Sequence, residues 1–364
     1  MRKYYIDNLR WMTVLLLFPY HIFMMYKFSG NGFYVKGPDN MGLSIAIDVI
    51  WPWFMPVLFT LAGMSSAWAL AKRTPAEYIR ERFSKLFIPF VFGLLLIMPI
   101  IAYFTAVFNE NYSGTFPAHC LVFFTRFSRD LSGYNGEFGI GHLWYILYLF
   151  IISLAALPVM VLYNRSTKKI NGKGINLAVL LALFVIPFIG QCIPILPGKS
   201  IFEYLFFFII GFMVLSQDCI IEKLKKHRFL LSGIFLMLMI LNTVYLSIYY
   251  SNRNMITDHR VLIHFFVIFE TEFYAYCGIL ALIGLSGTYL DVKNRYTDYF
   301  SKSSFGVYLF HLLWIVITAY FVLVRVHSIL LQIVIVLAGS VILTLITYEI
   351  VRRIPIVKTV FCLK

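Results

Sequence analysis

Apolar stretches of about 20 residues recur along the chain, separated by polar segments. A helix of this length spans a bilayer, because it rises about 1.5 Å per residue and the hydrocarbon layer is about 30 Å thick. The pattern predicts ten spans, near residues 9–28, 45–70, 86–108, 142–163, 175–196, 201–215, 229–250, 261–285, 305–324 and 329–351. Only residues 197–200 separate the fifth from the sixth, so these two can also be read as a re-entrant pair. We therefore expect an all-α, polytopic membrane protein with a single domain over residues 1–364.

The composition agrees with this interpretation, since 60% of the residues are hydrophobic and only 13% are charged, against about 25% charged in soluble proteins. The net charge of +14 would suit nucleic acid, but its distribution argues against that partner. If the N-terminus is cytoplasmic, about three quarters of the Lys and Arg residues fall on the cytoplasmic side, as the positive-inside rule requires. We expect both termini in the cytoplasm. The five cysteines form no CxxC pair, which argues against a disulfide framework or a zinc site.

The first apolar run carries Arg10 and, eleven positions later, His21. The run is longer than a usual signal-peptide core and no small-residue cleavage site follows, so we expect a retained helix. Arg10 and His21 then share a face, about 16 Å apart along the axis. An ionisable side chain within a bilayer is costly and by default marks a functional site. The alternative for His21 is a neutral imidazole hydrogen-bonded to a neighbouring helix.

Further ionisable residues occur in the predicted spans: Asp48, His264, Glu270, Glu272 and His311. Two carboxyl groups in one span are rare and mark a pathway or a site. Glu270 and Glu272 lie on different sides of their helix, so we expect different roles for them. The alternative for each is an ion pair with a basic residue of a neighbouring helix, and this structural reading suits Asp48 and His264 better.

Arg80, Arg82 and Lys85 form a basic cluster at the cytoplasmic start of the third span. Such a cluster fits an orientation signal in contact with lipid headgroups. It also fits capture of a phosphate-bearing cytoplasmic ligand, because a guanidinium group binds phosphate through two parallel N–H groups.

Five short motifs follow one another along the chain. They are Arg10-x10-His21 preceded by Asp7, Phe59-Thr-Leu-Ala-Gly63, Arg82-x-x-Lys85-Leu-x-x-Pro89, His142-Leu-Trp144-Tyr145 and Tyr308-Leu-Phe-His311. Their order resembles the membrane-bound acyltransferase 3 family over nearly the whole chain. The strings around His21 and His142 look most similar to the branch with periplasmic glucan succinyltransferases, although Lys85 stands where that family usually has arginine.

The resemblance implies an O-acyltransferase of the bacterial inner membrane that needs no metal. It would move an acetyl or succinyl group from cytoplasmic acyl-CoA to a hydroxyl of an extracytoplasmic glycan or glycolipid. The donor's phosphates would be held by Arg10, Arg82 and Lys85. The acceptor side would be formed by His142, Trp144, Tyr308 and His311.

His21 suits the chemistry that this transfer requires. It can take the proton of the attacking hydroxyl as a general base or carry the acyl group itself as a nucleophile, and both routes stay open. Glu270 or Glu272 would orient the imidazole, as the acid does in a catalytic triad. Pro19 would bend the helix just before His21. The outer loop, residues 109–141, would stack an acceptor sugar on its aromatic side chains or form an interfacial aromatic belt.

Two other classes of function fit the same pattern. A proton-coupled transporter or flippase would also carry buried His and Glu residues, although the sequence contains no inverted repeat. A scaffold subunit of a glycan-assembly complex is the third reading. The expected partners are acyl-CoA, the acceptor and the lipid bilayer, whereas a homo-oligomer or a glycan-synthase partner stays open.

Overall fold

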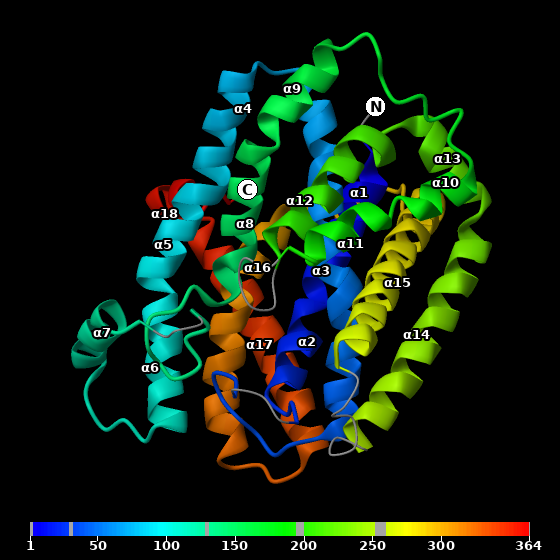
Figure 1. The fold of residues 1–364 in the computed structure, drawn as a ribbon. Helices are drawn as coiled ribbons and strands as arrows, with labels where there is room; N and C mark the ends of the chain where they lie inside the picture. The colour runs from blue at the N-terminus through cyan, green and yellow to red at the C-terminus, as the bar shows by residue number, and fades with distance from the viewer. Residues whose placement is uncertain (1–2, 29–31, 128–130, 194–199, 252–259, 364) are drawn as a thin grey trace. The chain divides into compact units, whose positions relative to one another are not determined.

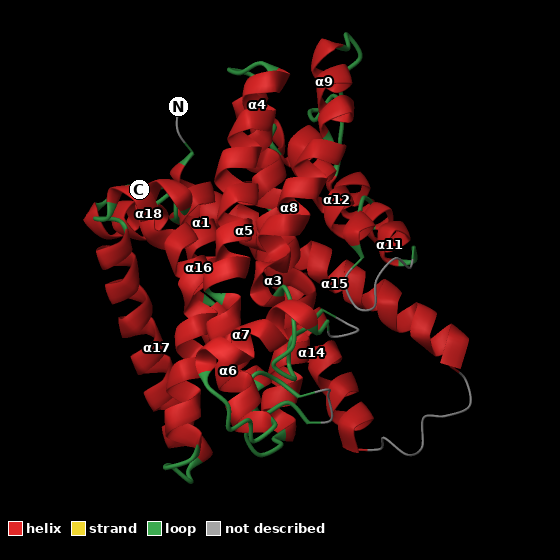
Figure 2. Ribbon diagram, turned by 90° about the vertical axis from the view of Figure 1, so that its left-hand side faces the viewer, coloured by secondary structure: helices red, strands yellow, loops and turns green. Residues whose placement is uncertain are grey.

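The computed structural model describes residues 3–28, 32–127, 131–193, 200–251 and 260–363, with only the backbone described at 260–264. Helices and their connecting loops make up all of these segments, and no strand occurs in the described chain (Figure 2). The predicted all-α class is therefore confirmed.

Six helices in the described residues are long and apolar enough to cross a membrane. They are Met41–Leu70 (α3), Pro75–Asn109 (α4, η1, α5 and α6 in succession), Arg228–Ser251 (α14), Phe265–Tyr289 (most of α15), Arg295–Leu323 (α16) and Ile329–Val351 (α17). Two bent helix pairs raise the number to eight if each pair forms one span. The polytopic prediction is thus confirmed, while the count of ten stays a prediction.

The first predicted span is divided into α1 (Tyr4–Leu15) and α2 (Leu17–Met24). Proline at position 19 has no N–H to donate to the carbonyl four residues earlier, which is that of Leu15. The break therefore falls where the proline removes a helical hydrogen bond. Leu16 keeps right-handed helical angles, with φ −63° and ψ −18°, so the chain continues in nearly the same conformation.

The fourth, fifth and sixth predicted spans are also interrupted. α8 (Trp144–Ala155) and α9 (Leu157–Arg165) meet at 41°, with Pro158 in the first turn of α9. The fifth consists of two short helices, α10 (Leu177–Ala182) and α11 (Val185–Gln191). The sixth contains α12 (Ile201–Ile210) and the π-helix η3 (Gly211–Leu215), and α13 (Asp218–Lys226) follows at 95°. The linker between the fifth and sixth spans lies mostly outside the described residues, so the re-entrant reading stays open.

The chain divides into two compact units, described separately below. The first unit contains Met1–Thr13, Asp48–Arg82 and Tyr148–Asp298. The second unit contains Val14–Ile47, Phe83–Leu147 and Tyr299–Lys364. The expectation of a single domain stays a prediction.

In the first unit, α3 approaches α12 closely at one glycine. A Cβ atom on Gly63 would lie 2.0 Å from the carbonyl oxygen of Phe208, so only glycine lets the two backbones approach this far. Nearby, Phe59 stacks on Tyr204 with ring centroids 4.6 Å apart. Helices α14 and α15 lie side by side in the same unit (Figure 1).

In the second unit, α2 packs against α17, and the Tyr26 hydroxyl donates a hydrogen bond to Gln332 Oε1 at 2.8 Å. α7 (Phe116–Thr125) packs against α6 (Met98–Asn109). The Asn109 side chain at the end of α6 donates to the carbonyls of Phe33 and Tyr134, at 2.9 and 3.2 Å. This amide joins the loop after α2 to the predicted outer loop.

Candidate active site

Three histidines from distant parts of the sequence meet in the second unit. His21 comes from α2, His142 from the short 3₁₀ helix η2 (Gly141–Leu143), and His311 from α16. The ring centroids of His21 and His311 lie 5.2 Å apart with the planes 29° from parallel. The rings of His142 and His311 are 5.1 Å apart and nearly perpendicular. The predicted catalytic residue and two predicted acceptor residues thus form one histidine cluster.

Backbone carbonyls fix two of the three rings. His311 Nδ1 lies 2.7 Å from the Tyr308 carbonyl oxygen, and His142 Nε2 lies 3.0 Å from that of Leu309. A carbonyl only accepts, so each of these nitrogens carries the proton. The other nitrogen of each neutral ring then holds a lone pair. These two atoms, His311 Nε2 and His142 Nδ1, are buried and have no hydrogen-bond partner among the described residues.

Tyr308 supports both of these histidines. Its hydroxyl donates to the backbone carbonyl of His142, and its own carbonyl accepts from His311. Its side chain is 3% exposed and its ring lies 5.5 Å from that of Tyr145. The two motifs that contain His142 and His311 therefore form one hydrogen-bonded structure.

A glycine sets the approach of His142 to this cluster. Gly141 has φ +50°, in the left-handed region, and a Cβ there would lie 2.6 Å from both Met98 Cε and the Tyr34 hydroxyl. No other residue fits this turn without strain. The glycine begins η2 and so places His142 two residues before the start of α8.

The other face of His21 meets an aromatic cluster, formed by Phe33, Tyr34 and Tyr134. The rings of His21 and Phe33 lie 5.9 Å apart, 19° from parallel. Phe33 in turn lies 5.1 Å from Tyr34 and 5.6 Å from Tyr134. Tyr134 belongs to the predicted outer loop, so aromatic contacts link that loop to His21. The sequence did not single out Phe33 and Tyr34, which lie in a short loop without a periodic pattern.

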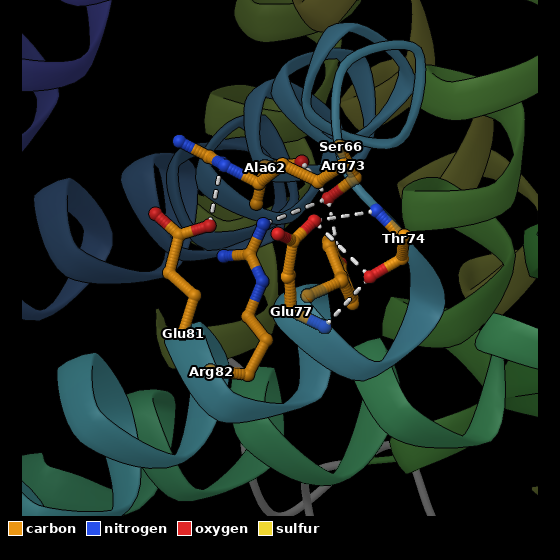
Figure 3. Close-up of polar contacts among 8 residues, drawn as sticks. Ala62, Ser66, Arg73, Thr74, Glu77, Glu81 and Arg82 are labelled. Atoms are coloured by element: carbon orange, nitrogen blue, oxygen red, sulfur yellow. Dashed lines mark hydrogen bonds and ion pairs between the residues drawn. The ribbon is translucent and has the colours of Figure 1, made fainter.

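Arg82, at the end of α4 (Pro75–Arg82), lies in the first unit. Figure 3 shows its hydrogen bond to Ser66. Its guanidinium donates to Ser66 Oγ at 3.1 Å and lies 4.5 Å above the ring of Tyr78. No carboxylate of the described chain pairs with it, and its Nε is buried without a hydrogen-bond partner there. In the same helix, by contrast, Glu81 forms an ion pair with Arg73 at 2.5 Å.

Arg10 binds Ser65, the residue before Ser66 in α3. Its guanidinium donates to Ser65 Oγ at 2.8 Å and pairs with Asp7 at 3.2 Å. Arg10 and Arg82 thus hold consecutive serines, and together we call them the arginine pair. Lys85, the third predicted phosphate ligand, is exposed on the π-helix η1 (Phe83–Phe87) of the second unit.

The two predicted glutamates lie on α15 (Arg260–Tyr289), in the first unit. Glu270 accepts a hydrogen bond from the Asn242 amide at 3.2 Å. Glu272 is 4% exposed and lies near Glu203 of α12, which is 6% exposed. The two acids have different neighbours, whereas the idea that one of them orients His21 stays a prediction.

The sequence did not identify Glu203 as a candidate site residue, because a glutamate in the first turn of a helix is common. Ser200 caps α12 and its hydroxyl accepts from the Glu203 backbone N–H, as in the usual serine and glutamate capping pattern. That pattern explains an acid at this position without a function. Only its burial beside Glu272 distinguishes it from an ordinary cap.

The other predicted residues are Trp144, Asp48 and His264. Trp144 is 8% exposed and its ring lies 6.5 Å from that of Tyr145. Asp48 accepts from the Tyr250 hydroxyl at 2.6 Å, and the His264 side chain lies outside the described residues. Where the structure describes side chains, no three His, Cys, Asp or Glu residues are grouped to hold a metal ion.

Comparison with known proteins identifies the family. Residues 3–349 match the family model described as an acyltransferase domain. No curated protein and no solved structure matches the chain. The family match covers all five motifs, including those that bring the histidines together and those that carry the arginine pair. The chain therefore belongs to the acyltransferase 3 family and is a membrane acyltransferase.

Proposed function

We propose that this protein transfers a short acyl group, acetyl or succinyl, from cytoplasmic acyl-CoA to a hydroxyl of an extracytoplasmic glycan or glycolipid. The histidine cluster is the observation that carries the proposal, because it provides a base beside two oriented hydrogen-bond acceptors. The membrane is the bacterial inner membrane, with both chain termini in the cytoplasm. The distribution of Lys and Arg residues supports this orientation.

In the proposed reaction, the acceptor oxygen attacks the thioester carbonyl and His21 takes the hydroxyl proton. The new C–O bond forms as the C–S bond breaks, and the CoA thiolate leaves and receives a proton. His311 and His142 each present a buried lone pair with no protein partner in the described chain. These lone pairs suit hydrogen bonds from hydroxyl groups of the acceptor.

The arginine pair suits the donor. Acyl-CoA carries its charge on phosphates, and charge-assisted hydrogen bonds from guanidinium to phosphate are stronger than neutral ones. Arg82 is the better placed of the two, because Asp7 already compensates part of the charge on Arg10. We assign both to the nucleotide end of the donor.

The aromatic cluster suits the acceptor. Sugar rings pack their C–H faces against aromatic side chains, and Phe33 reaches from the loop residues Tyr34 and Tyr134 to His21. An acceptor bound along these rings would bring a hydroxyl to the imidazole. The branch with glucan succinyltransferases stays our expectation for the acceptor class.

The test is thioester consumption by the purified protein in lipid nanodiscs, with acetyl-CoA or succinyl-CoA and a glucan acceptor. Thiol release should require the acceptor. His21→Ala should lower the rate by about a thousandfold, whereas His327→Ala, at an exposed position, should stay near wild type. Wild-type-like turnover in His21→Ala would overturn the catalytic assignment. Transport of acceptor without thiol release would instead support the transporter reading.

A further inference from the structure

A pocket of about 280 Å³ lies in the first unit, apart from the residues described above. It is bordered by the end of α9, the loop after it, α3 and the π-helix η3. Its lining combines aromatic, amide and cationic side chains, among them Tyr163, Asn164, Lys169, Phe212 and Gln217. Among the described residues, no acidic side chain lines it. We call it the loop pocket.

The loop that borders this pocket is held firmly by side chains. The Gln217 amide donates to the Ile170 carbonyl at 3.2 Å and its oxygen accepts from the Gly172 N–H at 3.2 Å. Lys223 donates to the Gly172 carbonyl at 2.9 Å, and the Tyr163 hydroxyl accepts from the Ile170 N–H at 3.2 Å. The wall that carries Lys169 is therefore fixed by the protein's own contacts.

The charge of this loop favours an anion. Residues 165–176 contain four basic residues and no acidic one. Lys169 is the cation of the lining, and no carboxylate of the described residues forms an ion pair with it. A cationic site without a protein counter-ion attracts negative ligands from solution.

The loop pocket is next to the arginine pair along α3. Ala67 lines the pocket, and the preceding residue, Ser66, accepts from Arg82. Another part of the lining, which includes Phe212, comes from η3, and short π-helical segments are often found at functional sites. Both anion-favouring features therefore lie at the same end of α3, within one unit.

We infer that the loop pocket binds the nucleotide end of the acyl-CoA donor, an inference that rests on the proposed function. Tyr163 and Phe212, with ring centroids 6.1 Å apart, offer apolar surface to the base. Asn164 can both donate to and accept from ring nitrogens, and Lys169 pairs with a phosphate. The volume is slightly below the roughly 300–1,000 Å³ of whole-ligand sites, so the pocket holds this end alone and leaves the thioester arm outside.

The decisive comparison uses two donors, acyl-CoA and acyl-pantetheine, which lacks the nucleotide. Lys169→Glu should raise the KM for acyl-CoA about tenfold or more and leave kcat unchanged. Its kcat/KM for acyl-pantetheine should equal that of wild type. The control is Lys168→Glu, the same charge change on a neighbour that does not line the pocket. Equal effects of the two variants, or equal effects on both donors, would overturn the inference.

A second measurement separates the nucleotide from a lipid phosphate, which shares its anionic chemistry. Adenosine 3′,5′-bisphosphate should bind wild type in neutral-lipid nanodiscs, and Lys169→Glu should weaken this binding about tenfold. If the variant instead loses only co-purified anionic lipid, the pocket is a lipid site and the inference fails. Bisphosphate binding that depends on Lys169 without thioester turnover would refute the proposed function and keep the nucleotide site.

Discussion

The histidine cluster and the arginine pair are held by different kinds of contact. The three imidazole rings of the cluster pack against one another, and backbone carbonyls fix His142 and His311 by hydrogen bonds. The arginine pair is partly exposed and bound by serine hydroxyls, an aspartate and an aromatic face. Backbone contacts hold a side chain in one orientation, whereas side-chain contacts can be exchanged for a ligand. We therefore expect the cluster to govern kcat and the arginine pair to govern the KM for the donor.

The largest effect predicted from this comparison is that of His311→Phe. Phenylalanine keeps a ring against His21 but has no nitrogen, so it removes the lone pair offered to the acceptor. We expect kcat to fall on the order of 100-fold, with the KM for acyl-CoA unchanged, in steady-state thiol-release assays.

The control is Phe18→Leu, which alters packing against the same ring of His311, 5.8 Å away, and keeps its nitrogens. This variant should lose little activity. If His311→Phe turned over like wild type, His311 would be a packing residue and the cluster would reduce to His21 and His142.

The next effect is that of Arg82→Ala on donor binding. Removing the guanidinium takes away a charge-assisted contact to phosphate, so we expect the KM for acyl-CoA to rise about tenfold or more, with kcat nearly unchanged. Arg80→Ala removes the same charge from an exposed position of the same helix and should raise KM far less. A fall in kcat at saturating donor would contradict the division between the two regions.

The sequence identified the residues of both regions, but not the residues that contact them. The apolar spans singled out His21 and His311, and the resemblance to the family added His142 and Tyr308. Helical periodicity placed Arg10 and His21 on a common face. Periodicity does not show which helices are adjacent, so the stacking of His311 on His21 could not be derived. Ser65 and Ser66 were not predicted either, since serine in an apolar helix gives no signal until an arginine reaches it.

The sequence also indicated some interruptions of the predicted spans and not others. The hydrogen bond lost at Pro19 was expected, because a proline beyond the first turn of a helix has no N–H to donate to the preceding turn. The replacement of one predicted span by α10 and α11 was not expected, since residues 175–196 are as apolar as a full span. Apolar content predicts burial in lipid or protein, but it does not distinguish one long helix from two short ones.

A smaller effect is expected from Tyr308→Phe. The ring stays in place, but the hydrogen bond from its hydroxyl to the His142 carbonyl is lost, at a cost of about 1 kcal/mol. We expect kcat to fall about three- to fivefold, with the KM for the donor unchanged. Tyr296→Phe is the control, because that side chain is 75% exposed on the same helix. A change in donor KM alone would assign Tyr308 to donor binding.

The smallest effect concerns a buried histidine outside both regions. His119 lies in α7, outside the membrane-spanning segments, with its ring 5.8 Å from Tyr103 and 5.1 Å from Tyr112. Burial lowers the pKa of its imidazole below the usual value of about 6.5. The unfolded chain therefore binds the proton more readily than the folded chain does. The stability that the neutral His119 ring contributes is fully present above about pH 6.5 and is lost as the pH falls through the folded-state pKa.

His119→Phe should reduce the drop in unfolding temperature between pH 7.5 and pH 5, because phenylalanine fills the aromatic site and takes up no proton. The substitution should recover at most about 1.4 kcal/mol of unfolding free energy per pH unit. The measurement is thermal unfolding in nanodiscs at both pH values. His327→Phe, at an exposed position, should leave the drop unchanged. Acyl transfer at pH 7.5 should stay near wild type in both variants, because neither residue belongs to the cluster. A loss of kcat in His119→Phe would show that the outer loop contributes to catalysis. The histidine cluster would then not be the region that alone governs kcat.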